Sequence, residues 1–180
     1  VYERLKEYLL EESTLHADET VVQVLRESGR DAKTKSYEWV YRTGLCSRRK
    51  ITIYEYRETR SQEHPKAFLK GYEGLLHTDG YQVYHNLPPG ITVIGCWAHV
   101  RRRFEQIIKN MSRGKRKDSD AQTALDYIGA LFVLEKKFAD LTPKKRMAAR
   151  LEESKPVSDA FFAWAAGLGA LPKSPLGDAT

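Results

Sequence analysis

Apolar positions in the first part of the chain follow a helical pattern once and an extended pattern three times. They recur at helical spacing over residues 2–10, which predicts an opening helix. Residues 15–25 are rich in β-branched side chains and predict a strand buried on both faces. Residues 36–43 and 50–57 alternate aromatic and polar side chains, as half-buried strands do. Three strands joined by short turns predict an antiparallel meander.

The middle of the chain changes to a pattern typical of parallel strands linked by helices. Ser61 is a candidate N-cap for a helix that runs to about residue 72 and is stopped by Gly74. Residues 75–78 are short and apolar, so they predict a buried strand reached by a parallel crossover. The elements expected next are a helical turn over 81–86, a strand over 91–95 and a helix over 97–110.

The last third of the chain has a helical pattern throughout. A polar, charged loop over 112–120 precedes a long helix over 121–139 with a wide apolar face. Thr142 and Pro143 form an N-cap and N1 pair for a helix that ends near residue 153. Residues 154–167 predict one more helix. The expected division is an N-terminal helix over 1–13, a core over 14–111, and a helical insertion region with a tail over 112–180.

The composition fits a globular protein. Of the 180 residues, 41% are hydrophobic and 30% are charged, and no apolar run approaches the roughly 20 residues that a membrane span needs. Cys46 and Cys96 are the only cysteines, which argues against a disulfide framework and fits a reducing cytosol. Because the chain lacks an initial methionine and stops in a tail rich in Gly and Pro, we expect it to be a piece of a longer protein.

The positive charge is concentrated in one segment. The net charge is +6, and residues 95–117 hold eight basic side chains against one acid, Glu105, so this segment accounts for the whole excess. The basic residues are Arg101, Arg102, Arg103, Lys109, Arg113, Lys115, Arg116 and Lys117. Such a concentration predicts a polyanion partner, most often nucleic acid. The alternative is a solvated basic loop.

Two aspartates occupy positions that call for a chemical explanation. Asp18 lies within the first apolar strand, where a carboxylate is costly unless it is paired or binds a metal. Asp79 ends the short strand over 75–78. Carboxylates at strand ends near arginines predict chemistry on a phosphate-bearing substrate with a hard divalent cation. The alternative is an Asp-Gly turn before a basic, solvated helix. Glu19 would point to the face opposite Asp18, so we do not predict it as a ligand.

Four short motifs carry a resemblance to a known family. They are ADET at residues 17–20, EHPKAFL at 63–69, TDGY at 78–81 and CWAHVRRRF at 96–104. In this order and spacing they closely resemble transposases of the insertion-sequence-66 family, which are bacterial DDE-type enzymes. ALDYIGALFVLE at 124–135 and the tail over 174–179 look like the same family's helical insertion. The resemblance implies an α/β fold with an RNase H-like mixed sheet, a three-strand antiparallel meander plus parallel strands, and a C-terminal all-helical subdomain.

The resemblance also implies an activity, a cofactor and partners. Asp18 and Asp79 would be the first two catalytic carboxylates of an enzyme that cleaves and transfers DNA strands with Mg²⁺ or Mn²⁺. The expected partners are transposon-end and target DNA, with a homo-oligomer in the full-length protein, no membrane, and a location in the bacterial cytoplasm. His99 and the eight basic residues would contact nucleic acid. Cys96 and His99 would be a signature beside the active site, with His99 near the scissile phosphate.

The third acid of the family is a glutamate in an asparagine-rich motif after the insertion. No such motif precedes Thr180, so we expect the chain to stop before that residue, to bind metal weakly and to be inactive alone. Glu135 is the internal candidate, although its surroundings match the insertion, and Glu152 and Glu153 are expected to be solvated helix acids.

Other interpretations of these residues stay open. Cys96 and His99 have a spacing that could begin a zinc site, which needs four ligands, but a core cysteine and a capping histidine explain the pair as well. The chain could serve as a non-catalytic domain that binds DNA or assembles subunits. It could also be part of an ordinary metal-dependent nuclease acting on RNA–DNA hybrids.

Overall fold

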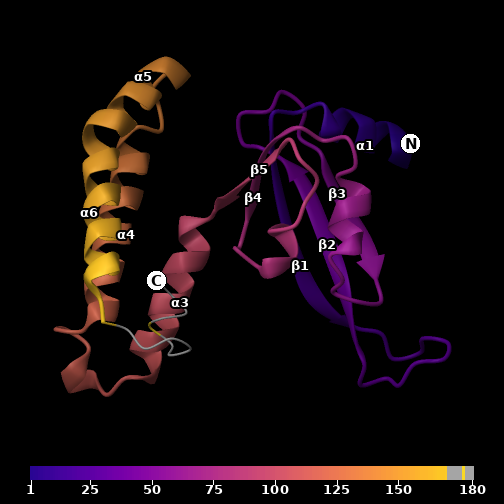
Figure 1. Ribbon diagram of the computed structural model, residues 1–180, viewed down its shortest axis with the longest axis horizontal. Helices are drawn as coiled ribbons and strands as arrows, with labels where there is room; N and C mark the ends of the chain where they lie inside the picture. The colour runs from indigo at the N-terminus through magenta and orange to yellow at the C-terminus, as the bar shows by residue number, and fades with distance from the viewer. Residues whose placement is uncertain (170–175, 177–180) are drawn as a thin grey trace. The chain divides into compact units, whose positions relative to one another are not determined.

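The computed structural model describes residues 1–169 and residue 176, and it divides into two compact units. Residues 1–96 form the first unit and residues 97–180 the second (Figure 1). Most of the resembling tail over 174–179 lies outside the described residues. Within the described residues no helix is long and apolar enough to cross a membrane.

A five-stranded mixed sheet organises the first unit, in the order β3-β2-β1-β4-β5. β1 pairs antiparallel with β2, β2 pairs antiparallel with β3, and β4 runs parallel to both β1 and β5. The strands are β1 (Thr14–Gln23), β2 (Lys35–Thr43), β3 (Thr52–Arg57), β4 (Gly74–Thr78) and β5 (Ile91–Gly95). The predicted meander, parallel strands and α/β RNase H-like fold class are therefore confirmed.

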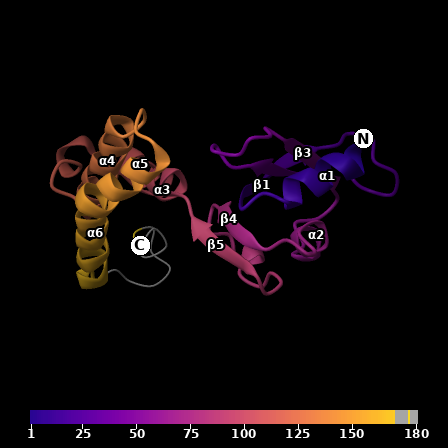
Figure 2. The same cartoon turned by 90° about the horizontal axis from the view of Figure 1, so that it is seen from above.

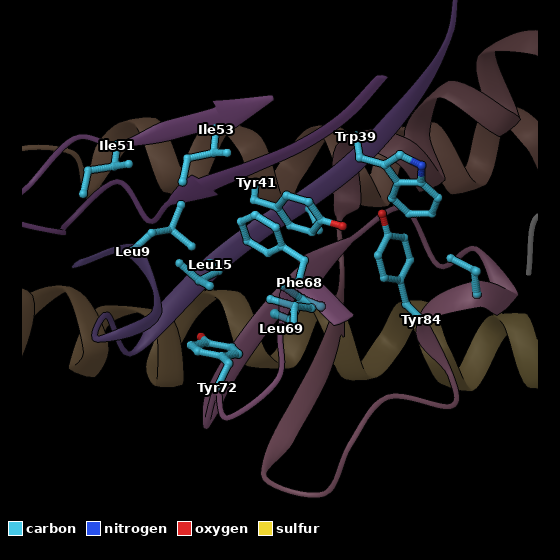
Figure 3. Packing of buried hydrophobic residues seen from close by; sticks show 13 residues of the cluster. Leu9, Leu15, Trp39, Tyr41, Ile51, Ile53, Phe68, Leu69, Tyr72 and Tyr84 are labelled. Atoms are coloured by element: carbon cyan, nitrogen blue, oxygen red, sulfur yellow. The ribbon is translucent and has the colours of Figure 1, made fainter. Parts of the chain in front are cut away.

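Two helices pack on one face of this sheet. α1 (Tyr2–Leu10) contributes Leu9, and α2 (Glu63–Phe68) contributes Phe68, to a core whose strand residues include Leu15, Tyr41 and Leu76. The rings of Tyr41 and Phe68 stack with their centroids 3.6 Å apart and 5° between their planes (Figure 3). Burial of these side chains fixes which face of each strand looks inward, because side chains alternate along a strand.

The first strand differs from its prediction in length and in burial. β1 ends at Gln23, and Leu25 lies beyond it with 71% of its surface exposed. Val21 is 51% exposed, so the strand is not buried on both faces. The reason is that β4 pairs with β1 only as far as His16, whereas β2 follows it to Gln23. The outer half of β1 is therefore an edge strand of the antiparallel β1-β2-β3 part of the sheet, where β-branched residues occur as readily as in buried strands.

Smaller differences concern the predicted helix after Ser61. The N-cap of α2 is Gln62 and not Ser61, although the Ser61 hydroxyl accepts the N–H of Glu63 at 3.3 Å just before the helix. The helix ends at Phe68 instead of near residue 72, because Gly71 turns the chain with φ +80°. β3 begins at Thr52, and the turn before β5 contains the single 3₁₀ turn η1 (Gln82–Tyr84).

The second unit is helical and has a core of its own. Its elements are α3 (Trp97–Asn110), η2 (Arg113–Lys115), α4 (Asp120–Lys137), α5 (Pro143–Ala149), η3 (Arg150–Ser154) and α6 (Lys155–Gly167). α4 and α6 lie side by side in both views (Figures 1 and 2), and Phe104, Ile128 and Phe161 are buried between the helices. The contacts of α3 thus group it with the later helices. The domain boundaries predicted from the sequence, at residues 13 and 111, stay predictions.

The two helices predicted over 142–153 and 154–167 form one continuous helical run. Thr142 caps its start by accepting the N–H of Lys145 at 3.5 Å, as predicted. A π-helical stretch, η3, joins α5 to α6. It ends two residues before Pro156, which has no N–H to donate and would disturb a regular α-helical turn.

Gly74 provides a test of how tightly the first unit is packed where β4 begins. A Cβ at this position would lie 2.7 Å from the Ser13 carbonyl oxygen and 2.7 Å from the Tyr72 hydroxyl, at a φ of +151°. We expect Gly74→Ala to lower the free energy of unfolding by about 2–4 kcal/mol, from backbone strain plus overpacking.

Gly71→Ala is the matched control, since Gly71 has φ +80° but nothing within 4 Å of its added Cβ. It should cost only about 1–2 kcal/mol. Urea unfolding followed by circular dichroism measures both. Equal losses would mean that the close approach around Gly74 contributes nothing.

Candidate active site

The strands that carry Asp18 and Asp79 are neighbours. β1 and β4 are parallel, and their last aligned pair is His16 with His77. Asp18 and Asp79 each lie two residues beyond that pair in the same chain direction, and Asp79 is the first residue after β4. The pairing of β1 with β4 ends before either aspartate. Asp18 is exposed and Asp79 is half-buried.

Backbone donors orient both carboxylates. Oδ1 of Asp18 accepts the N–H of Glu19 at 2.9 Å, and Oδ1 of Asp79 accepts the N–H of Tyr81 at 2.8 Å. Gly80 turns the chain between Asp79 and Tyr81 with φ +82°, a conformation that glycine adopts without strain. The Asp-Gly turn considered as an alternative to a metal ligand is therefore real. It leaves Oδ2 of each aspartate without a hydrogen-bond donor among the described residues.

Glu19 occupies the other face of β1, as its position next to Asp18 predicts. Its side chain is only 1% exposed. Arg60 donates Nε–H to Oε1 at 2.8 Å and a second N–H to the same oxygen, and the Tyr84 hydroxyl donates to Oε2 at 2.7 Å. Burial raises the pKa of Glu19, and the bonds from Tyr84 and Arg60 oppose that rise.

The sequence reasoning missed Arg60 and Tyr84. The signal available was the acid inside an apolar strand, which requires a partner or a metal. Nothing in the sequence pairs Glu19 with residues 41 and 65 positions away. Arg60 also lies over the ring of Tyr81, with 3.6 Å between its Cζ and the ring centroid. The rings of Trp39 and Tyr84 meet edge to face at 6.2 Å beside this cluster (Figure 3).

His16 and His77 are stacked on neighbouring strands, each two residues before one of the two aspartates. Their ring centroids are 4.7 Å apart, with 18° between the ring planes. Burial lowers the pKa of both rings, and the pKa of His16 is lowered further by His77 and Arg42. Nδ1 of His77 is buried without a partner in the described part of the chain. The sequence pattern assigned these histidines no role.

Cys96 and His99 fall in different units. Cys96 is a free, half-buried cysteine at the end of the first unit, and His99 lies in α3. Among residues 1–169 and 176, no group of three or more His, Cys, Asp or Glu side chains could hold a metal. The described residues therefore do not form a zinc site around this pair.

The predicted basic residues belong to α3 and the segment that follows it, and some of them, including Arg101 and Arg116, make contacts within the chain. Arg101 donates Nε–H to Glu105 at 2.8 Å, and Arg116 donates to the backbone carbonyls of Met111 at 3.0 Å and Lys109 at 3.4 Å. Six others present exposed side chains: Arg102, Arg103, Lys109, Arg113, Lys115 and Lys117. The segment is thus partly structural and partly open to a ligand.

Glu135 and Glu153 of the helical unit are held in ion pairs. Both carboxylate oxygens of Glu135 accept bonds from Arg150, at 2.7 and 2.6 Å, and Arg150 lowers the pKa of Glu135. Glu153 pairs with Lys137 at 2.6 Å. These contacts link α4 to η3. The presence of Glu135 and Glu153 is therefore explained by their role in packing α4 against η3.

Comparison with known proteins identifies the family of this chain. The model of the Transposase IS66 family matches residues 1–180. The chain belongs to the IS66 transposase family. It is 29% identical to Uncharacterized protein y4hP of Sinorhizobium fredii (strain NBRC 101917 / NGR234), over 91% of this chain and 32% of that protein. It is 28% identical to Uncharacterized protein y4qI of the same strain, over 92% and 33%.

The chain spans about a third of the length of these two curated relatives. No solved structure matches it significantly. The family of the chain is therefore known from its sequence match, and the arrangement of its strands and helices is known only from the structure described above.

The ion pair of Glu135 with Arg150 predicts a dependence of stability on pH. Arg150 lowers the pKa of Glu135, so the pair stabilises the folded protein above the ordinary carboxyl pKa of 4.5, and this contribution disappears as the pH falls through the lower folded-state value. The side chains are 50% and 41% exposed, which limits the contribution to about 0.5 kcal/mol.

Glu135→Gln should therefore lower the free energy of unfolding by about 0.5 kcal/mol at neutral pH and have no effect in strong acid. Glu152→Gln is the control, because Glu152 makes no ion pair among the described residues. Thermal unfolding across the acidic range measures both variants. A Glu135→Gln variant as stable as the wild type at neutral pH would contradict the structural role.

Proposed function

We propose that this chain is a catalytic-core segment of an IS66-family DNA transposase, which cleaves DNA strands and transfers them with a divalent cation. The observation that carries the proposal is the equal offset of Asp18 and Asp79 beyond the aligned His16–His77 pair. Two carboxylates on one face of adjacent parallel strands are what a shared cation needs, because without a cation they repel each other.

The donor chemistry of the site fits Mg²⁺ or Mn²⁺. Asp18 and Asp79 offer hard oxygen ligands, and their Oδ1 atoms are oriented by backbone N–H groups. Asp18 and Asp79 would hold the cation, which when bound supplies positive charge to the phosphate oxygens and lowers the pKa of the attacking water or hydroxyl group. The third acid of the proposed site is expected after residue 180, as the resemblance to this family implies.

The other residues of this face support the carboxylates. The rings of His16 and His77 stack with their centroids 4.7 Å apart on the two strands that lead to the aspartates. Glu19 on the opposite face has both oxygens occupied by Arg60 and Tyr84, so it acts in holding the structure together and leaves metal binding to Asp18 and Asp79.

The DNA partner is proposed to contact the exposed basic residues of the helical unit. Arg102, Lys109, Lys115 and their neighbours place positive charge on α3 and the segment after it. Such charges neutralise backbone phosphates without reading sequence. His99 and the Cys96 signature are proposed to lie near the scissile phosphate in the assembled enzyme.

The test of the proposed function uses the complete gene product and a labelled transposon-end duplex. We expect Mg²⁺- or Mn²⁺-dependent cleavage and joining, and we expect Asp18→Asn and Asp79→Asn each to reduce both by more than about 100-fold. Both variants should stay folded, since asparagine retains an oxygen acceptor for the same backbone N–H. Glu135→Gln is the control that should keep activity.

The outcomes of this assay separate the candidate functions. Cleavage of RNA–DNA hybrids without joining would favour an ordinary nuclease. DNA binding with no cleavage under any metal would favour a binding or assembly domain. Efficient strand transfer by residues 1–180 alone would mean that the third acid lies inside this chain.

The basic segment predicts a change in the salt dependence of DNA binding. Replacing Arg102, Lys109 and Lys115 together by alanine should weaken binding about equally for every sequence and lower the salt slope by about one unit per lost phosphate contact. Arg116→Ala is the control, because its guanidinium is bonded to backbone carbonyls and should affect stability more than the slope. Titrations at several salt concentrations measure both, and an unchanged slope in the triple variant would indicate a solvated loop.

A further inference from the structure

The pairing of β1 with β4 ends before it reaches the two aspartates. Strand pairing aligns β1 with β4 only from Thr14 to His16, so no backbone ladder reaches Asp18 and Asp79. Asp79 is the first residue after β4 and belongs to a turn that is otherwise free to move away from β1. Some other contact must hold this turn against the strand that carries Asp18.

Glu19 supplies that contact from the opposite face of β1. Its carboxylate bonds directly to the hydroxyl of Tyr84, which is the last residue of η1. It also bonds to Arg60, whose guanidinium lies 3.6 Å from the ring centroid of Tyr81. The N–H of Tyr84 donates a hydrogen bond to the carbonyl of Tyr81 at 3.0 Å, so these two residues are the ends of one turn. Glu19 contacts one end directly and the other through Arg60.

The same turn orients the carboxylate of Asp79. The N–H of Tyr81 donates to Oδ1 of Asp79 at 2.8 Å, so the position of Tyr81 sets the direction of that carboxylate. Glu19 is bonded in the chain to Asp18 and donates its own N–H to Oδ1 of Asp18 at 2.9 Å. One residue is therefore connected to both aspartates, through its backbone on one side and through its side chain on the other.

The burial of Glu19 makes this link stiff. The side chain is 1% exposed, and a buried carboxylate that loses a partner is strongly destabilised, so the three donors are held in place. Arg60 is also shared between the carboxylate and the Tyr81 ring, which restricts its rotation. The contacts of Glu19 thus hold the turn in place next to β1, as strand pairing holds the residues of β4 that precede the turn.

We propose that Glu19 and Arg60 are a positioning pair that holds the turn of Asp79 against β1 and so sets the two aspartates for a divalent cation. This inference rests on the proposed function for the cation, but the positioning of Asp79 can be measured without metal. Residues that orient metal ligands through hydrogen bonds typically change metal affinity 10–100-fold when they are replaced.

The experiment compares Glu19→Gln with Glu27→Gln in the 180-residue chain. Glu27 is the matched control because it pairs with Arg30 at 2.8 Å, is 14% exposed, and lies in the loop between β1 and β2. The first readout is hydrogen exchange of the Tyr81 amide, followed by NMR. The second is Mn²⁺ binding, followed by paramagnetic broadening of amide signals near Asp18 and Asp79.

Glu19→Gln should speed exchange of the Tyr81 amide about three- to tenfold, the value of one ordinary hydrogen bond, and weaken Mn²⁺ binding about tenfold or more. Glu27→Gln should change neither. Tyr84→Phe, which removes one donor to Glu19, should give a smaller change in the same direction. Tyr72→Phe, which removes a bond of 2.9 Å from a core tyrosine to the Leu75 carbonyl, should leave Mn²⁺ binding unchanged.

Unchanged exchange at Tyr81 in Glu19→Gln would overturn the positioning role, and so would equal losses of Mn²⁺ affinity in Glu19→Gln and Glu27→Gln. If the wild-type chain does not bind Mn²⁺ at Asp18 and Asp79, the proposed metal site fails in this chain. The exchange of the Tyr81 amide would still decide whether Glu19 positions the turn of Asp79.

Discussion

The parallel pairing of β1 with β4 is the constraint on which the candidate site depends. It involves three aligned pairs, and the middle one, Leu15 with Leu76, is completely buried. Because side chains alternate along a strand, a slip of one residue would move every side chain of that strand to the other face. The apolar burial of Leu15 and Leu76 therefore fixes the register that gives Asp18 and Asp79 the same offset from the last aligned pair.

Beyond the last aligned pair, side chains take over from the backbone. Glu19 is buried and fully bonded on the core face, while Asp18 on the other face is exposed. A buried carboxylate is rarely worth its desolvation for stability alone, since apolar residues of similar volume often do as well. What the Glu19 cluster provides is a defined position for a turn, which an apolar cluster would hold less specifically. The two neighbouring acids of β1 thus have separate roles, one toward solvent and one toward the fold.

The helical unit has an independent basis for its stability. Its core centres on Phe104, Ile128 and Phe161, and the rings of Trp97 and Phe161 meet edge to face at 5.1 Å. Ion pairs between α4 and η3 add contacts on its surface. The acids proposed for catalysis lie in the first unit, and the basic residues proposed for DNA lie in the second. The proposed catalytic acids and the proposed DNA-binding residues therefore belong to units with separate hydrophobic cores.

The sequence by itself determined most of the elements. Alternation predicted the meander, the short apolar run predicted β4, and the pattern over 97–110 predicted α3 with the bounds that the structure has. It also identified Asp18 and Asp79 as acids that need an explanation, because a carboxylate in or at the end of an apolar strand is unusual. These are local properties, which depend on a few neighbouring residues.

Only the tertiary structure decided the rest. β-branched residues over 15–25 could not reveal that β4 stops at Thr78 and leaves the outer half of β1 uncovered. Nor could they show that Glu19 meets Arg60 and Tyr84, since the partners come from a turn and a 3₁₀ segment far along the chain. Strand length and burial depend on what lies beside a segment in space. Periodicity along the chain carries no information about that neighbour.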